Sequence, residues 1–231
     1  MISFISTSCN RLEHTQLTLE HNINIAKDHE IVLLNYGDKD GLDDYIKENF
    51  MEHIEKRRLK YYRVNEKYFH MSKAKNLGHR LAMGEFLFQL DIDTFIYERI
   101  INDCYKALEL NGYACPYFTD NMIYGLSADN FFKLGGYDER FEGWGTEDTD
   151  LAMRCKHAGI VPVNVHVQSI KQIDHSDDLR FRSFAPEYQS ACYEDSLKIY
   201  NEHKEQKTTY VNKNGFSKFK VIKNFTEEII V

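Results

Sequence analysis

Short apolar runs alternate with segments of helical period over the first 90 residues of the chain. Runs of this length predict buried strands, and the segments between them predict helices that lead from one strand to the next. The runs lie at 2–6, 30–34, 60–64 and 85–90, and the helical segments at 11–26, from 42 to about 53, and 71–83, the last with Gly84 as its C-cap. This alternation predicts an α/β fold with a single Rossmann-like, mostly parallel sheet flanked by helices.

The pattern is less regular after residue 90. We expect helices at about 97–110, 128–134, 147–157 and 187–202, and strands at about 112–117, 122–126 and 161–168. The tail beyond residue 204 is polar and rich in lysine. Because no internal repeat or low-complexity linker divides the chain, we expect one domain over 1–183, with a C-terminal helical extension and basic tail over 184–231 packed on it.

Charge and cysteine content narrow the classes of function. Acidic residues outnumber Lys and Arg by 36 to 29, and the resulting net charge of -7 repels a nucleic-acid backbone. We therefore expect no nucleic-acid partner. The five cysteines form no CxxC pair, and the N-terminus has neither a basic leader nor a span of about 20 apolar residues. These features predict reduced thiols and a cytoplasmic location.

The turn after the first strand excludes a common nucleotide-binding loop. It runs from Thr7 to Arg11 without a glycine, whereas a dinucleotide fold carries GxGxxG there so that its backbone can approach a pyrophosphate. The glycine-rich loop of P-loop enzymes is absent from the whole chain. If this sheet binds a nucleotide, a metal ion must therefore do what the glycine loop does elsewhere.

Aspartates two residues apart occur three times, at 38 and 40, at 91 and 93, and at 148 and 150. Only Asp91 and Asp93 directly follow a buried apolar strand, at the edge where open α/β sheets bind ligands. Carboxylates at that edge can hold Mg²⁺ or Mn²⁺ against the oxygens of a diphosphate, and a polar turn is the alternative. A calcium loop around Asp38 fails, because with Gly41 as its sixth residue the first ligand would be Tyr36. We interpret that segment as a turn, with Asp38 as a partner for a polar ligand edge.

The stretch from Gly135 to Leu151, GGYDERFEGWGTEDTDL, is the most informative. It holds the only tryptophan of the chain between two glycines, followed by acids at the start of a predicted helix. The helix dipole stabilises such acids by roughly 0.3 to 1 kcal/mol each, which is the alternative interpretation of Glu147 and Asp148. That role does not explain Trp144, whose ring suits the apolar face of a sugar while the acids bind its hydroxyls.

Histidine offers one further ligand. We expect the histidines at 14, 21, 53 and 203 to be solvated. His175 differs, because it follows a strand and lies among acids in the run DHSDD, where an imidazole can complete a cation site.

These motifs together resemble the metal-dependent glycosyltransferases of the glycosyltransferase A (GT-A) fold, and are most similar to the β-galactosyltransferase and chondroitin-polymerase-like group. The resemblance covers about residues 2–180, and its pieces come in family order. They are the turn at 7–11, the acidic turn at Asp38, Lys75-Asn76-Leu77-Gly78 on a helix, the strand-terminal Asp91-Ile92-Asp93, and the block at 135–151. The DxD pair is promiscuous, whereas the last block is highly specific.

The resemblance implies a role for each matching position. Its nucleotide and donor contacts are Thr7, Arg11, Asp38, Lys75, Asn76 and Asp91, with Lys75 where arginine is more usual. Its metal ligands, for Mn²⁺ or Mg²⁺, are Asp91, Asp93 and His175. Its sugar and acceptor wall is Trp144, Gly145 and Glu147, and its catalytic acids are Asp148, as the base, and Glu147.

By the same resemblance, residues 1–183 form the catalytic domain of an inverting transferase of the kind used in polysaccharide biosynthesis. It would move a hexose or N-acetylhexosamine from a UDP-sugar to a hydroxyl of a glycan or lipid-linked acceptor. Inversion is favoured because an acid follows Glu147, where retaining relatives tend to carry Asn. Two alternatives stay open: a retaining transferase of the polypeptide-glycosylating type, and a non-catalytic sugar- or nucleotide-binding module.

Two basic stretches suggest peripheral contact with the anionic inner face of a membrane that carries a lipid-linked acceptor. They are the run from Lys56 to Arg63 and the tail lysines at 204, 207, 213, 218, 220 and 223, which lie among three phenylalanines. Solvated faces and a packed extension are the alternative. The oligomeric state is not readable from the sequence.

Overall fold

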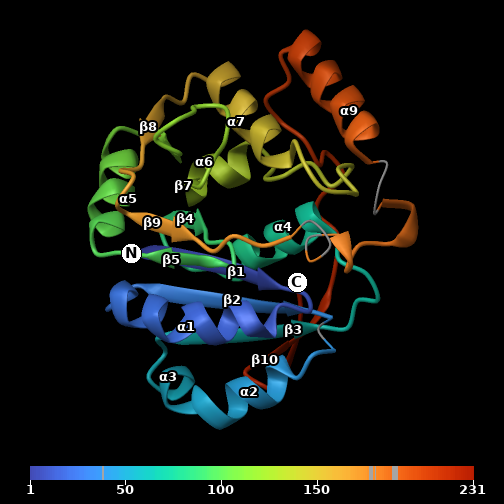
Figure 1. The fold of residues 1–231 in the computed structure, drawn as a ribbon. Helices are drawn as coiled ribbons and strands as arrows, with labels where there is room; N and C mark the ends of the chain where they lie inside the picture. The colour runs from blue at the N-terminus through green and yellow to red at the C-terminus, as the bar shows by residue number, and fades with distance from the viewer. Residues whose placement is uncertain (38, 177–178, 180, 189–191) are drawn as a thin grey trace.

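The computed structural model describes residues 1–37, 39–176, 179, 181–188 and 192–231 (Figure 1). Within these residues a nine-stranded sheet has the order β11-β10-β3-β2-β1-β4-β7-β6-β8. Its strands are β1 (Ile2–Ser8), β2 (Glu30–Tyr36), β3 (Leu59–Val64), β4 (Phe86–Gln89), β6 (Tyr113–Cys115), β7 (Gly125–Ser127), β8 (Pro162–Asn164), β10 (Lys220–Lys223) and β11 (Glu227–Ile230). A second sheet pairs β5 (Thr94–Ile96) with β9 (Ile170–Gln172).

Most strands of the large sheet point the same way. The neighbours β3, β2, β1 and β4 are parallel, and β7 runs antiparallel between β4 and β6, so that β6 and its parallel partner β8 share the direction of β4. The carboxyl ends of β1, β4, β6 and β8 therefore meet at one edge of the sheet, where ligands bind in open α/β folds. The predicted mostly parallel α/β sheet is confirmed.

Helices cover both faces of the sheet (Figure 1). The first core joins one face to α1 (Leu12–Ala26), α2 (Leu42–Asn49), α3 (Met51–Glu55) and α5 (Arg99–Glu109). The second core joins the other face to α4 (Met71–Leu81), α6 (Ala128–Lys133) and α7 (Glu147–His157). Neighbours on one strand alternate between the cores, as Phe4 and Ile5 do, and burial of each such side chain contributes about 1.5 to 3 kcal/mol.

The helices expected at 71–83 and 42–53 differ from those of the structure. The helix expected to reach residue 83 ends at Leu81, because Ala82 is already extended, so the prediction of Gly84 as its C-cap is wrong. Gly84 instead lies against β1, where an added Cβ would come within 2.6 Å of Ser3 Oγ. The single helix expected from 42 to 53 is interrupted at Phe50, whose φ of -127° lies outside the helical range.

The C-terminal region joins the same sheet. The 3₁₀ turn η1 (Pro186–Tyr188) and helix α9 (Cys192–Gln206) are followed by β10, which pairs with β3 and β11. The helix expected at 187–202 thus begins and ends a few residues later in the structure. The hairpin of β10 and β11 was not predicted from the sequence. The division at residue 183 stays a prediction, and the tail strands extend the sheet of the first part.

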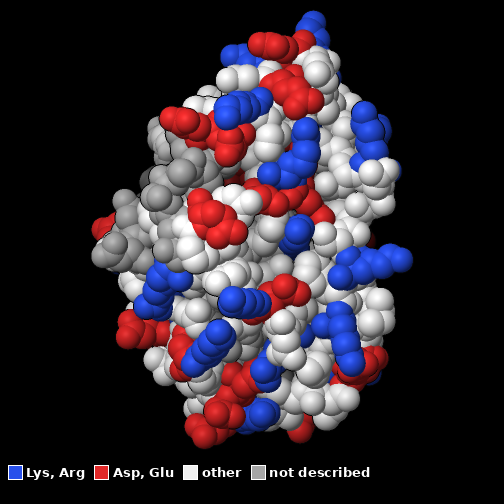
Figure 2. Space-filling view, turned by 90° about the vertical axis from the view of Figure 1, so that its right-hand side faces the viewer, with Lys and Arg blue, Asp and Glu red and all other residues white. Residues whose placement is uncertain are grey.

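Basic residues of both stretches lie next to acids. Lys220 and Lys223 of β10 pair with Glu228 and Glu227 of β11. Lys56, Lys60 and Arg63 pair with acids in the same way. Figure 2 shows the two signs of charge intermixed on the face it displays. None of the helices in the described part of the chain is long and apolar enough for a membrane crossing.

Candidate active site

A cleft of about 700 Å³ opens at the carboxyl edge of the sheet. Its walls come from the turn after β1, the segments after β4, β6 and β8, and the start of α7. The predicted site residues that line it are Thr7, Arg11, Lys75, Asp91, Asp93, Trp144, Gly145, Glu147, Asp148 and His175. The cleft thus brings together residues that are far apart in the sequence. Arg11, for example, donates a hydrogen bond to the carbonyl oxygen of Leu179, 168 positions later.

The strand-end carboxylate Asp93 is the polar centre of one side of the cleft. Its Oδ2 lies 2.9 Å from His175 Nε2 and 3.2 Å from Arg11 Nη2, and all three side chains are nearly buried. His175 Nδ1 lies 3.0 Å from the backbone carbonyl oxygen of Ser176, while Nε2 faces Asp93. His14, expected to be solvated, is instead buried and stands edge-on to the His175 ring.

Asp91 lies beside this centre in an environment with excess negative charge. Asp91 is exposed to the cleft, but desolvation by the cleft walls raises its pKa; Lys75 lowers this pKa, and the neighbouring Asp93 and Glu147 raise it. A divalent cation would offset that charge, and carboxylate and imidazole donors suit Mn²⁺ or Mg²⁺. In the part of the chain that the structure describes, no three acids, histidines or cysteines converge closely enough to form a ready cation site. Carboxylate and imidazole, the donor types of Asp91, Asp93 and His175, fit such an ion by their chemistry, and Asp93 and His175 are already in contact.

Lys75 and Glu147 form a buried ion pair on the floor of the cleft. Lys75 Nζ lies 2.8 Å from Glu147 Oε1 and above the ring of Tyr137. Burial disfavours the charged amine, but the nearby Glu147, Tyr137 and Asp91 raise the pKa of Lys75 above its ordinary value. The other oxygen of Glu147, Oε2, is buried and has no hydrogen-bond partner among the described residues. It is therefore placed to accept a hydroxyl from a ligand in the cleft.

Asp148 follows Glu147 on the first turn of α7. Its side chain is partly exposed in the cleft, and its Oδ1 accepts a hydrogen bond of 2.8 Å from the backbone N–H of Thr149. Desolvation and the charge of Glu147 raise the pKa of Asp148 to about 6. A carboxylate with that pKa is ionised at neutral pH and is a stronger base than an ordinary aspartate.

A strained turn leads from Trp144 into α7. Gly145 has a φ of 100° and the β-branched Thr146 a φ of 69°, a left-handed conformation that is rare for such a residue. The turn leaves Trp144 36% exposed, with its ring edge-on to Phe181 at a centroid distance of 5.9 Å. Part of the indole therefore faces the cleft while the rest is packed.

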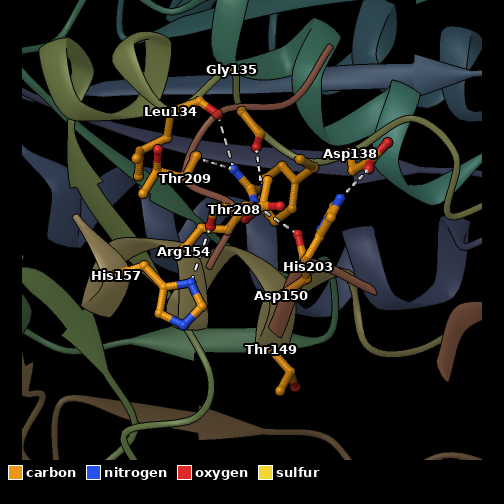
Figure 3. Close-up of polar contacts among 12 residues, drawn as sticks. Leu134, Gly135, Asp138, Thr149, Asp150, Arg154, His157, His203, Thr208 and Thr209 are labelled. Carbon is orange, nitrogen blue, oxygen red and sulfur yellow. Dashed lines mark hydrogen bonds and ion pairs between the residues drawn. The ribbon is translucent and has the colours of Figure 1, made fainter. Parts of the chain in front are cut away.

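A buried polar network holds α7 in place (Figure 3). Arg154 is fully buried, pairs with Asp150 one turn earlier, and donates to the carbonyl oxygens of Leu134 and Gly136. His203 of α9 contacts Asp150 through Nδ1 at 2.7 Å. The expectation that His203 is solvated is therefore wrong, because its side chain is buried between α7 and α9 and links the two helices.

Asn76 does not face the cleft. It is fully buried, and its side-chain amide exchanges two hydrogen bonds with the backbone of Tyr137, at 2.8 and 2.9 Å. In the structure its contacts fix the segment after Gly135 and Gly136, which corrects the implied contact between Asn76 and the donor. Asp38 lies outside the described residues.

Several cleft residues were not among the predicted ones. Tyr117, Phe118 and Val167 lie in the segments after β6 and β8, line the cleft, and are each more than 60% exposed. β6 and β8 are parallel neighbours, so these segments leave the sheet side by side. Asp91 was identified because it follows a strand, and Tyr117 also follows one. Tyr117 was missed because the strand expected at 112–117 included it.

Comparison with known proteins identifies similar chains. The family described as the N-terminal domain of galactosyltransferase matches residues 104–176. Beta-1,4-galactosyltransferase 4 of Cricetulus griseus is 24% identical over 149 residues, a match covering 54% of this chain and 42% of the relative. The chain thus spans less than half the length of this curated relative.

Two solved structures share the fold. The mannosyltransferase PcManGT from Pyrobaculum calidifontis, in complex with GDP-Man and Mn²⁺, has a TM-score of 0.65 at 15% identity, over 78% of this chain and 60% of that one. S. aureus TarS 1–349, in complex with UDP-GlcNAc, has a TM-score of 0.61 at 11% identity, over 86% and 65%. The chain has the GT-A fold and is similar to galactosyltransferases, which confirms this part of the predicted resemblance, whereas the metal dependence stays a prediction.

Proposed function

We propose that this protein is an inverting glycosyltransferase that moves a hexose or N-acetylhexosamine from a UDP-sugar to a hydroxyl of a glycan or lipid-linked acceptor. The observation that carries the proposal is the composition of one cleft. The ionisable Asp148, the buried Oε2 of Glu147, which has no hydrogen-bond partner among the described residues, and the partly exposed Trp144 belong to the same cleft as the strand-end Asp93. The galactosyltransferase match over 104–176 contains Asp148, Glu147, Trp144 and His175.

In this proposal Asp148 is the general base. It takes the proton of the acceptor hydroxyl as that oxygen attacks the anomeric carbon, from the face opposite the departing UDP, a role that contributes about 10² to 10⁴ in rate. Its pKa of about 6 keeps it ionised at neutral pH. Glu147 Oε2 accepts a sugar or acceptor hydroxyl, and the Lys75 ion pair at Oε1 holds that carboxylate still.

The donor lies on the side of the cleft formed by β1 and β4. Thr7 and Arg11 line this side, and Arg11 supplies a guanidinium whose geometry matches phosphate oxygens. Asp91, Asp93 and His175 would hold Mn²⁺ or Mg²⁺, which when bound supplies positive charge for the diphosphate leaving group. Two solved structures of the same fold carry nucleotide-sugars, GDP-Man and UDP-GlcNAc, which supports a donor of this class.

The acceptor lies against Tyr117, Phe118 and Trp144, which line the same cleft. Exposed aromatic rings provide flat apolar area that fits the apolar face of a pyranose ring. Peripheral contact with an anionic membrane and a cytoplasmic location stay predictions, and flotation with anionic and neutral liposomes tests the first of them.

A donor panel tests the function. Nucleotide release is measured with Mn²⁺ and glycan acceptors: UDP release from UDP-galactose, UDP-glucose and their N-acetyl forms, and GDP release from GDP-mannose as the competing donor. We expect release with at least one UDP-sugar, and loss of release in Asp148→Asn. A β-linked product from an α-linked donor, read by NMR, supports inversion, whereas retained configuration would favour the polypeptide-glycosylating type. Binding of UDP without transfer to any acceptor would favour a non-catalytic module.

A further inference from the structure

Each carboxylate oxygen of Asp93 already contacts two side chains of the protein. Oδ2 is shared by His175 Nε2 and Arg11 Nη2, at 2.9 and 3.2 Å, and Oδ1 lies 3.4 Å from the side chains of Thr94 and Gln172. The Asp93 side chain is only 5% exposed. A cation that binds Asp93 must therefore displace a group that already contacts it.

Arg11 is the group that has to leave. The imidazole of His175 is a metal ligand, so a cation can bind His175 and Asp93 together. A guanidinium carries a permanent positive charge and has no lone pair with which to bind a metal ion. Arg11 Nη2 and the incoming cation would compete for the same carboxylate oxygen and repel each other. Arg11 is also tied to the carbonyl oxygen of Leu179 through Nη1, at 3.0 Å, so it is held in this position from two sides.

The contact between Arg11 and Asp93 also affects the binding of a diphosphate in the cleft. Four carboxylates line the cleft, those of Asp91, Asp93, Glu147 and Asp148, and this charge opposes an anionic donor. Of the cations that line the cleft in the described part of the chain, Lys75 is paired with Glu147 and Arg11 with Asp93. A diphosphate would take over the Arg11 guanidinium, to which it offers several anionic oxygens, and would thereby expose Asp93 to the metal ion.

We propose that Arg11 is an internal counter-ion of Asp93 that couples the two ligands, because it passes from the carboxylate to the diphosphate when metal and donor bind together. The inference rests on the proposed function, since it assumes a nucleotide diphosphate and a divalent cation in this cleft. Each ligand removes the obstacle to the other, so the coupling is positive and reciprocal. Arg11 in this role opposes the binding of metal alone and favours the binding of nucleotide alone.

Binding measurements without turnover test the coupling. Mn²⁺ affinity is measured by electron paramagnetic resonance with and without saturating UDP, and UDP affinity by calorimetry without metal. For Arg11→Gln we expect Mn²⁺ alone to bind about tenfold tighter and UDP alone about tenfold weaker, within the usual range of coupling between sites. The gain in Mn²⁺ affinity on addition of UDP should shrink. Opposite effects on the two ligands separate this role from a structural one, which would weaken both.

Arg182→Gln is the matched control. Arg182 is an exposed arginine that donates to the backbone carbonyl of Asn10, so the variant removes the same charge next to Arg11 without touching Asp93. We expect both affinities to stay within about twofold of wild type, as for exposed charges screened by salt. Arg11→Lys keeps the charge but cannot span Leu179 and Asp93 with a planar fork, and should fall between wild type and Arg11→Gln.

The outcomes separate the inference from the function it rests on. If wild type binds Mn²⁺ and UDP but Arg11→Gln binds Mn²⁺ no tighter, the coupling role of Arg11 is overturned. The same holds if Arg182→Gln reproduces the effects of Arg11→Gln. If wild type binds neither ligand, the proposed function fails together with the inference. Thermal melts of each variant confirm that the compared proteins are folded.

Discussion

Lys75 Nζ and Glu147 Oε1 are 2.8 Å apart beneath the cleft and join α4 to the first turn of α7. Both side chains are less than 10% exposed. The buried amine also lies near Asp91 and Asp148, which lower each other's acidity, so one cation stabilises a group of three acids. The catalytic side of the cleft thus depends on a residue whose implied role was to bind the donor.

Removal of the amine should destabilise the protein. Lys75→Met leaves the Glu147 carboxylate buried without its partner, and loss of one member of such a pair costs about 3 to 5 kcal/mol. The double variant Lys75→Met, Glu147→Gln removes the unpaired charge and should recover most of that loss. Urea unfolding of the single and double variants measures both values. Equal destabilisation in the single and double variants would contradict the pairing.

The activity should depend on the ionisation of Asp148. Because the raised pKa of Asp148 is about 6, kcat/KM should fall tenfold per pH unit below 6 and level off above it. Glu147→Gln removes a charge that raises this pKa, so its pH profile should shift to lower pH. A pH profile of kcat/KM for wild type and Glu147→Gln, with metal and donor saturating, checks both points. A profile that is flat from pH 5 to 8 would exclude Asp148 as the base.

The raised pKa of Asp148 also predicts an effect on stability: the ionised carboxylate that activity requires lowers the free energy of unfolding. The folded protein binds the Asp148 proton more tightly than the unfolded chain, so the stability from this group is present below about pH 3.8 and lost as the pH rises through 6. Asp148→Asn should therefore raise the free energy of unfolding at pH 7.5, by about 1 to 2 kcal/mol after allowance for water in the cleft. Urea unfolding at pH 7.5 and pH 4 measures the gain, which should shrink at the lower pH.

Part of this site was predictable because it rests on local patterns. A carboxylate directly after an apolar run, such as Asp93, is placed at the ligand edge by the strand alone. Asn76 lies next to Lys75 in sequence, but the helix turns their side chains by about 100° from one another, so one reaches the cleft and the other Tyr137. The burial of His203 depends on how α9 docks against α7, which no local pattern encodes.

The docking of α9 should support the catalytic helix. His203→Ala removes the contact with Asp150 and leaves that buried carboxylate with Arg154 as its partner. Hydrogen bonds to charged groups contribute about 1.5 to 3 kcal/mol, so the melting temperature should fall. If the contact also positions α7, kcat should decrease with little change in donor KM. The control is His157→Ala. His157 lies at the end of α7 and contacts the backbone carbonyl of Thr208, so this variant should leave kcat near wild type.

The aromatic residues at the mouth of the cleft should act on the acceptor and not on the donor. Tyr117 and Phe118 follow β6, which β4 and β7 separate from β1 and the turn that carries Arg11, and they are 65% and 78% exposed. Phe118→Ala therefore removes little packing, and the free energy of unfolding should stay within about 0.5 kcal/mol of wild type. An aromatic contact of about 0.5 to 1.5 kcal/mol lost from the acceptor corresponds to an increase in acceptor KM of about two- to tenfold.

Phe132→Ala, at an exposed phenylalanine of α6 that does not line the cleft, is the matched control. Initial rates with either substrate varied separate the two KM values, and an equal rise in donor KM would place these rings on the donor side instead.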